Sequence, residues 1–100
     1  MTRKVLWAPR AKSDYGMQLA YIAGQDPRAA QLVKERLDAA VGKIAENPLG
    51  RPNRVAGYLE RSVPKTSLVI ALELLPDGSV GITRIIHTAR DWPANRWPSD

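Results

Sequence analysis

The chain lacks cysteine altogether and has a single histidine, His87. Without cysteine there can be no disulfide bond, thiolate metal ligand or cysteine nucleophile. One histidine excludes a metal site built from several imidazoles, and no glycine-rich nucleotide motif is present, so we expect neither a metal nor a cofactor. No apolar run is long enough to cross a membrane, and the N-terminal residues have no secretory signal pattern. We therefore expect a cytoplasmic protein that does not bind membranes.

The composition predicts one folded domain over residues 1–100. Of its 100 residues 44% are apolar and 25% are charged, which is too apolar for a disordered chain. Fifteen basic and ten acidic side chains give a net charge of +5. Such a balance suits a polyanion or an acidic partner, although it can also serve solubility alone. The charges are spread along the chain, so any basic site must be assembled by the fold.

Residues 4–46 predict a strand followed by two helices. The short apolar run Lys4–Trp7 reads as a strand that ends before Pro9. Apolar residues spaced four, four and three apart predict an amphipathic helix over 11–23. Asp26 can cap a second helix, predicted over 28–46, and Pro27 suits its start. The short turn between the helices predicts an antiparallel hairpin.

The second half of the chain predicts three strands, over residues 58–63, 67–74 and 79–86. The last two are joined by the turn sequence Pro76-Asp77-Gly78. The element order is therefore β-α-α-β-β-β. We expect an α+β fold, with an antiparallel-rich sheet and the helix hairpin packed on one face. Two tryptophans, Trp92 and Trp97, predict that part of the C-terminal tail docks on the body or on a partner.

The candidate site is a group of cations around the single imidazole. Arg84, His87 and Arg90 lie at the end of the last predicted strand, and Arg61 lies on the strand 58–63. If these strands pair, the arginines can hold phosphoryl oxygens while His87 transfers a proton. An RNA 2′-hydroxyl can attack its own phosphate, so no metal is needed. The alternative is that His87 is structural and that the arginines form ordinary surface ion pairs.

The helix hairpin offers a second possible site. Alanines at positions 29, 30, 39 and 40 would let a partner helix or strand approach closely. The alternative is ordinary packing of the hairpin on the sheet.

Four stretches of the chain resemble motifs of the RelE/ParE superfamily of toxins. They are the pattern W-x-P-R-A-x-x-D at 7–14, the D-P helix start at 26–27, the turn NPLGRP at 47–52 and the ending R-x-x-H-x-x-R-D at 84–91. The resemblance covers nearly the whole chain. It implies a β-α-α-β-β-β fold and the toxin role in a bacterial type II toxin–antitoxin system.

The resemblance leaves two activities open, because RelE-like members cut mRNA on the ribosome whereas ParE-like members poison DNA gyrase. In the central strand Leu68, Leu72 and Glu73 stand where many members have two tyrosines and an arginine. These replacements remove part of the basic and aromatic residues expected of the ribonuclease branch. We therefore expect a ParE-like protein that arrests growth by inhibiting DNA gyrase and is not itself a catalyst.

Two alternatives remain at this stage. One is a metal-independent, ribosome-dependent mRNA endonuclease, with His87 as the proton-transfer group and Arg61, Arg84 and Arg90 holding the phosphate. The other is a degenerate toxin that only binds its antitoxin. All three readings imply a cognate antitoxin whose C-terminal segment wraps the helix hairpin and sheet, with operator DNA contacted only through that antitoxin.

Overall fold

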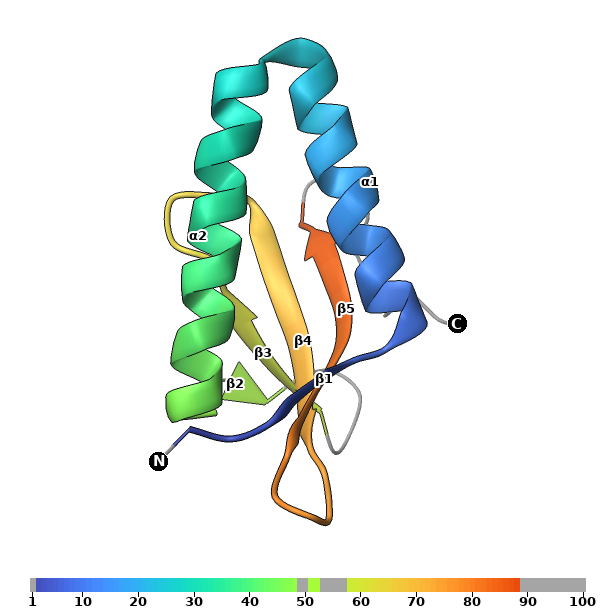
Figure 1. Ribbon diagram of the computed structural model, residues 1–100, viewed down its shortest axis with the longest axis vertical. Helices are drawn as coiled ribbons and strands as arrows, with labels where there is room; N and C mark the ends of the chain where they lie inside the picture. Colours follow the sequence, from blue (N-terminus) through green and yellow to red (C-terminus); the bar gives the residue numbers. More distant parts are fainter. Residues whose placement is uncertain (1, 49–50, 53–57, 89–100) are drawn as a thin grey trace.

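The computed structural model describes residues 2–48, 51–52 and 58–88, which form two helices and five strands (Figure 1). In chain order these are β1 (Val5–Trp7), α1 (Pro9–Gln25), α2 (Pro27–Glu46), β2 (Arg51–Pro52), β3 (Leu59–Ser62), β4 (Leu68–Leu74) and β5 (Val80–His87). The predicted order is confirmed, with the two-residue strand β2 as an addition. The first helix is longer than the predicted range of 11–23 at both ends.

The strands form one mixed sheet in the order β1-β5-β4-β3-β2. β1 pairs in parallel with β5, and the other neighbours are antiparallel. The pairing of β4 with β5 shifts by one residue, because Ala71 lies opposite Arg84 whereas Leu72 lies opposite Ile82. Thr83 is the extra residue of this bulge, and its hydroxyl donates to the Ala71 carbonyl at 3.1 Å.

The two helices form the antiparallel hairpin that the sequence predicts, and Figure 1 shows them on the same side of the sheet. Asp26 caps α2, since its Oδ1 accepts hydrogen bonds from the backbone N–H groups of Arg28 (3.0 Å) and Ala29 (3.3 Å). Pro27 occupies the first turn, where its missing N–H costs nothing. Neither helix in the described ranges is long and apolar enough to span a membrane.

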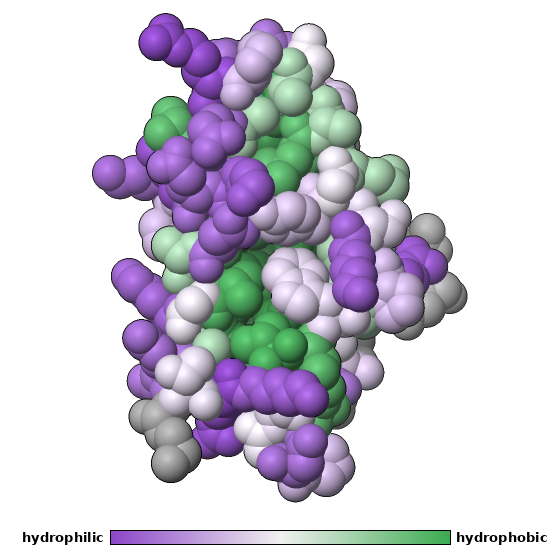
Figure 2. All heavy atoms as spheres, in the orientation of Figure 1, coloured by the Kyte–Doolittle hydropathy of each residue, from purple (hydrophilic) through white to green (hydrophobic). Residues whose placement is uncertain are grey.

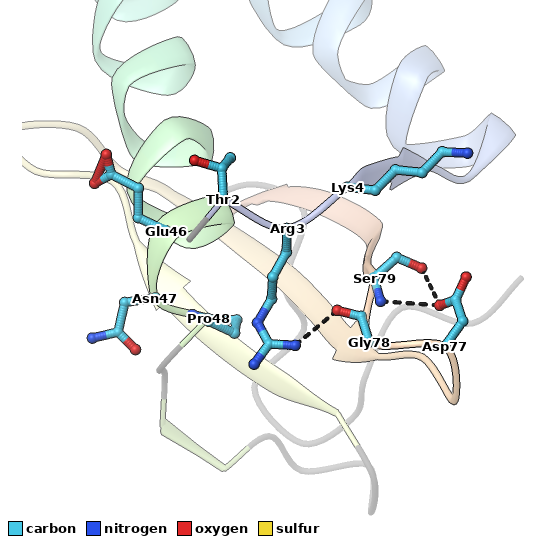
Figure 3. A pocket seen from close by; sticks show the side chains of 9 residues that line it. All are labelled: Thr2, Arg3, Lys4, Glu46, Asn47, Pro48, Asp77, Gly78 and Ser79. Carbon is cyan, nitrogen blue, oxygen red and sulfur yellow. Dashed lines mark hydrogen bonds between the residues drawn. The ribbon is translucent and has the colours of Figure 1, made fainter.

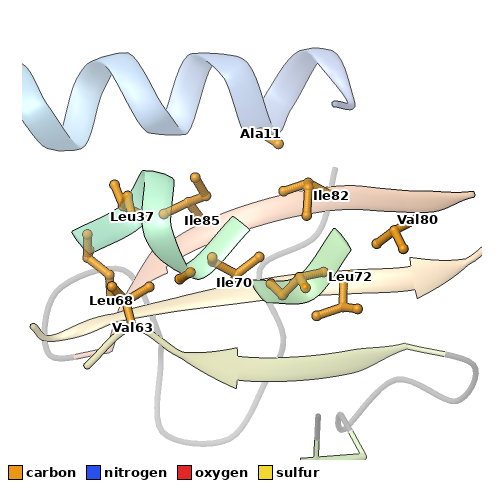
Figure 4. Packing of buried hydrophobic residues seen from close by; sticks show 11 residues of the cluster. Ala11, Leu37, Val63, Leu68, Ile70, Leu72, Val80, Ile82 and Ile85 are labelled. Carbon is orange, nitrogen blue, oxygen red and sulfur yellow. The ribbon is translucent and has the colours of Figure 1, made fainter. Parts of the chain in front are cut away.

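The core lies between the hairpin and the sheet (Figure 4). Alternate residues of β4 point toward the helices, and Leu68, Ile70 and Leu72 are almost completely buried there. They meet Leu37 of α2 and Ile85 of β5, both also buried. Each such side chain contributes about 1.5–3 kcal/mol by leaving water. This layer fixes α1 and α2 over the sheet and so positions the residues considered next.

Candidate functional site

Arg84, one of the four predicted site residues, is bound to an aspartate of the first helix. Its Nε donates to Oδ2 of Asp14 at 2.7 Å, and its Nη2 donates to Oδ1 at 3.3 Å. The two side chains are only 12% and 14% exposed. Oδ2 of Asp14 also accepts the backbone N–H of Ile85 at 3.0 Å. This two-point contact is the strong form of an arginine–carboxylate pair.

The pair has a structural reason. β1 pairs with β5 only from Val80 to Ile82, so within the described residues β5 has no strand neighbour on that side beyond Ile82. Asp14 reaches this exposed edge from α1 and accepts the Ile85 N–H, while Arg84 neutralises its charge. An aspartate on the helix therefore covers the edge of the strand where β1 ends.

Arg61 lies on β3, with β4 between it and β5. It is opposite Ile70, which in turn is opposite Ile85. Its Nη1 donates to the backbone oxygen of Asn47 at 3.2 Å, at the C-terminal end of α2. Cations are favoured there, because the last carbonyl groups of a helix carry partial negative charge. Arg61 is thus directed toward the end of a helix.

His87 is the last residue of β5 and is half-buried opposite Leu68 of β4. It shares its strand with Arg84, three residues earlier, whereas Arg61 is two strands away. The predicted residue Arg90 and the tryptophans Trp92 and Trp97 lie outside the described residues. The structure therefore puts Arg84 and His87 on one strand but does not bring Arg61 to them.

A cleft of about 340 Å³ is lined by Trp7, Lys12, Tyr15 and Asp38. Trp7 and Tyr15 meet edge to face, with ring centroids 5.6 Å apart. The Tyr15 hydroxyl donates to Oδ1 of Asp38 at 2.8 Å and so links the two helices. Figure 2 shows apolar side chains gathered in a hollow between hydrophilic ones on the face drawn there. Aromatic walls with a few polar groups are typical of a binding cleft.

Hydrogen bonds fix the charges at the mouth of this cleft. Burial raises the pKa of the Tyr15 phenol, and its hydrogen bond to Asp38 raises it further. Burial of Asp38 opposes its ionisation, but hydrogen bonds from Lys34 and Tyr15 outweigh this effect and lower the pKa of the carboxyl group. At neutral pH the cleft therefore presents a neutral phenol and a carboxylate.

A larger hollow, of about 570 Å³, lies where the N-terminal segment, the end of α2 and the β4–β5 turn meet (Figure 3). Arg3 Nη1 donates to the Gly78 carbonyl at 2.8 Å, and the Arg3 N–H donates to the Ala45 carbonyl at 2.8 Å. Asp77 accepts hydrogen bonds from the backbone N–H and the hydroxyl group of Ser79. The two hydrogen bonds of Arg3 thus connect the N-terminal segment to the end of α2 and to the β4–β5 turn, which surround the hollow.

Comparison with known proteins decides the family. The family described as the ParE toxin of the type II toxin–antitoxin system, parDE, matches residues 5–92. The chain belongs to the ParE toxin family.

Individual relatives agree with this assignment. Over 95 residues this ParE-family toxin is 34% identical to Y4kP of Sinorhizobium fredii, covering 93% of this chain and 97% of that protein. Over 89 residues it is 35% identical to the toxin RelE1 of Caulobacter vibrioides, covering 87% of this chain and 95% of that protein. Both alignments therefore cover most of this chain and most of each relative.

Solved structures show the same fold. A chain of the chromosomal ParDE system from P. aeruginosa superposes with a TM-score of 0.78 at 16% identity, covering 86% of this chain and 96% of that one. A chain of the RelBE2 toxin–antitoxin complex from Mycobacterium tuberculosis gives a TM-score of 0.57 at 20% identity, covering 87% and 99%. The predicted fold is therefore confirmed, and the family match and curated relatives confirm the predicted membership of the RelE/ParE superfamily.

Two features of this ParE-family toxin were missed from its sequence. The first is the Asp14–Arg84 pair, although Asp14 is the last residue of the pattern W-x-P-R-A-x-x-D by which the chain resembles its family. That pattern could have marked Asp14 as a residue with a specific contact, but it does not indicate that the partner is Arg84. The second is the Tyr15–Asp38 link, which joins two helices through residues 23 positions apart.

Proposed function

We propose that this ParE-family toxin arrests growth by binding DNA gyrase, without cutting RNA, and that a cognate antitoxin neutralises it. The observation that carries the proposal is the Asp14–Arg84 pair. A phosphate that binds the Nε and Nη2 groups of Arg84 must displace Asp14 from them. Arg84 already makes two hydrogen bonds to a carboxylate with little exposure to water, so this exchange is costly.

The position of Arg61 supports the same proposal. Its guanidinium donates to the end of α2, and strand β4 lies between its own strand and β5. Phosphate chemistry needs cations and a proton-transfer group held around one atom. In the ranges that the structure describes, Arg61 and Arg84 are not arranged in this way.

The antitoxin partner rests on separate support. The solved relatives come from a ParDE toxin–antitoxin system and a RelBE2 toxin–antitoxin complex. The interhelical cleft of about 340 Å³, with its two aromatic walls, suits an apolar side chain of such a partner. Exposed apolar side chains on the helices, among them Met17 at 66% and Tyr21 at 51%, extend the surface available to a protein.

The second candidate is a ribosome-dependent mRNA endonuclease that uses His87, Arg61, Arg84 and Arg90. It is favoured by the 35% identity to a protein named RelE1. A degenerate toxin that only binds its antitoxin is the third candidate, and it predicts no growth arrest at all.

Pulse labelling after induction of the chain alone separates these candidates. Gyrase inhibition predicts that thymidine incorporation falls first while methionine incorporation continues. A His87→Ala variant should then arrest growth as the parent does, and purified toxin should inhibit supercoiling by gyrase. If methionine incorporation collapses within minutes, and His87→Ala abolishes that effect while circular dichroism shows a folded protein, the endonuclease replaces our proposal.

A further inference from the structure

A second groove lies on the side of α2 that faces the turn between β3 and β4. It has a volume of about 210 Å³ and is lined by Arg36, Ala39, Ala40, Lys43 and Pro64. Figure 1 shows this turn beside α2. The Arg36 Nη1 donates to the backbone oxygen of Lys65 at 3.2 Å and so holds the two walls together. The two walls of the groove are therefore held in place by a contact within the folded chain.

The groove combines an apolar interior with a rim of one charge. Ala39, Ala40 and Pro64 supply its small apolar walls, and its volume of about 210 Å³ leaves room for one apolar side chain. Arg36 and Lys43 flank these surfaces, and no acidic residue is among the described lining residues. The interhelical cleft differs, because Lys12 and Asp38 give it charges of both signs. Of these two sites, the groove beside α2 is the one whose described lining residues carry charge of one sign, which favours a negatively charged partner.

We infer that this groove anchors an acidic segment of the antitoxin, which inserts one leucine-sized apolar side chain between flanking carboxylates. The inference rests on the proposed antitoxin partnership and gives that partner a docking point and a chemistry. The carboxylates pair with Arg36 and Lys43, and the apolar side chain covers Ala39.

Two other occupants fit the groove less well. A second copy of the chain carries the same net charge of +5 and would bring like charges together at the rim. A single-stranded nucleic acid would meet the cations, but the groove has no aromatic side chain among its described lining residues on which a base could stack. An acidic peptide with one apolar side chain can pair with the cations of the rim and also contact the apolar interior.

The test uses the folded full chain and, as its probe, the purified product of the small reading frame adjacent to the toxin gene. Ala39→Trp fills the groove from an exposed helix position, and Ala23→Trp makes the same change on an exposed position of α1. Lys43→Glu reverses a charge on the rim, and Lys4→Glu makes the same charge change outside the groove. Circular dichroism checks that all four variants fold.

We expect Ala39→Trp and Lys43→Glu each to weaken binding about 10- to 100-fold, which corresponds to losing one buried side chain or one desolvated charge pair. The Ala23→Trp and Lys4→Glu controls should bind within about threefold of the parent, and the loss in Lys43→Glu should shrink as salt is raised.

Each other outcome overturns a specific step. If the parent binds and the groove variants bind as tightly as the controls, the groove is not the docking point although the antitoxin partnership stands. If the parent itself does not bind, the partnership fails and the inference falls with it. If the chain alone is a dimer in light scattering and Ala39→Trp makes it a monomer, the groove is a contact between copies of the toxin.

Discussion

The pair formed by Asp14 and Arg84 is the contact whose removal should disturb the fold most clearly. In an Asp14→Asn variant the amide oxygen can still accept the Ile85 N–H, so the cover on the β5 edge is kept. The charge that neutralises Arg84 is lost. Because the Arg84 side chain is only 12% exposed, its guanidinium cannot turn to water without leaving its place beside β5. The variant therefore isolates the electrostatic part of the contact.

The expected loss of unfolding free energy is about 3 kcal/mol. Breaking a fully buried ion pair costs about 3–5 kcal/mol, and the slight exposure of both groups places this pair at the low end. A domain of this size has only about 5–15 kcal/mol in total. With a urea m value of about 1.5 kcal/mol per molar, the unfolding midpoint should fall by about 2 M.

Urea denaturation followed by far-ultraviolet circular dichroism measures this shift. Arg84→Met should cost a similar amount, because it leaves the Asp14 carboxylate without its cation. The double variant should cost less than the sum of the two, with a coupling energy of about 2 kcal/mol. Lys34→Met removes one partner of an exposed ion pair, with both side chains 49% exposed, and serves as the control that should hardly move the midpoint. A midpoint for Asp14→Asn within 0.3 M (about one-seventh of the expected shift) of the parent would refute the reasoning.

Three further perturbations test other parts of the fold. Asp26→Ala should lower the free energy of unfolding by about 1 kcal/mol, because the cap on two N–H groups of α2 is lost. Gly78→Ala should cost about 1–2 kcal/mol in the same urea assay, since Gly78 has a φ of 89° that alanine adopts only with strain. For Asp38, whose pKa is lowered in the folded state, the stabilising contribution is present above pH of about 4 and is lost as the pH falls. An Asp38→Asn variant should therefore show a flatter decline of thermal stability between about pH 5 and pH 2, and an unchanged slope would contradict this.

Local patterns in the sequence were sufficient to predict the helices and the longer strands of the fold. The apolar stripe of α2 repeats with the helical period, and Leu37, Ala40 and Ile44 are buried as that period requires. The continuous apolar run of β4 likewise predicted a buried central strand, and five of its residues are buried. Asp26 and Pro27 marked the start of α2, because a cap depends only on residues two or three positions away.

The candidate site was harder to predict, because it depends on contacts between distant residues. Asp14 and Arg84 are separated by 70 positions, and nothing in the local pattern around either residue requires the other. The bulge at Thr83 also shifts the pairing of β5 by one residue, which alternation along the strand does not reveal. The group of cations expected around His87 was inferred from strand ends alone, and that inference could not show that an aspartate from α1 would bind one of them.

The stability of the Asp14–Arg84 pair also bears on the choice between the proposed activities. A phosphate that binds the Nε and Nη2 groups of Arg84 must displace Asp14 from them, at a cost set by the coupling energy of the pair. A coupling of about 2 kcal/mol corresponds to a penalty of about 30-fold on phosphate binding at that arginine. A ribonuclease that relied on Arg84 would carry this penalty in every turnover, whereas a toxin that acts by binding a protein would carry none. The double-variant cycle on Asp14 and Arg84 thus measures, by unfolding alone and without an activity assay, the penalty that a phosphate would meet at Arg84.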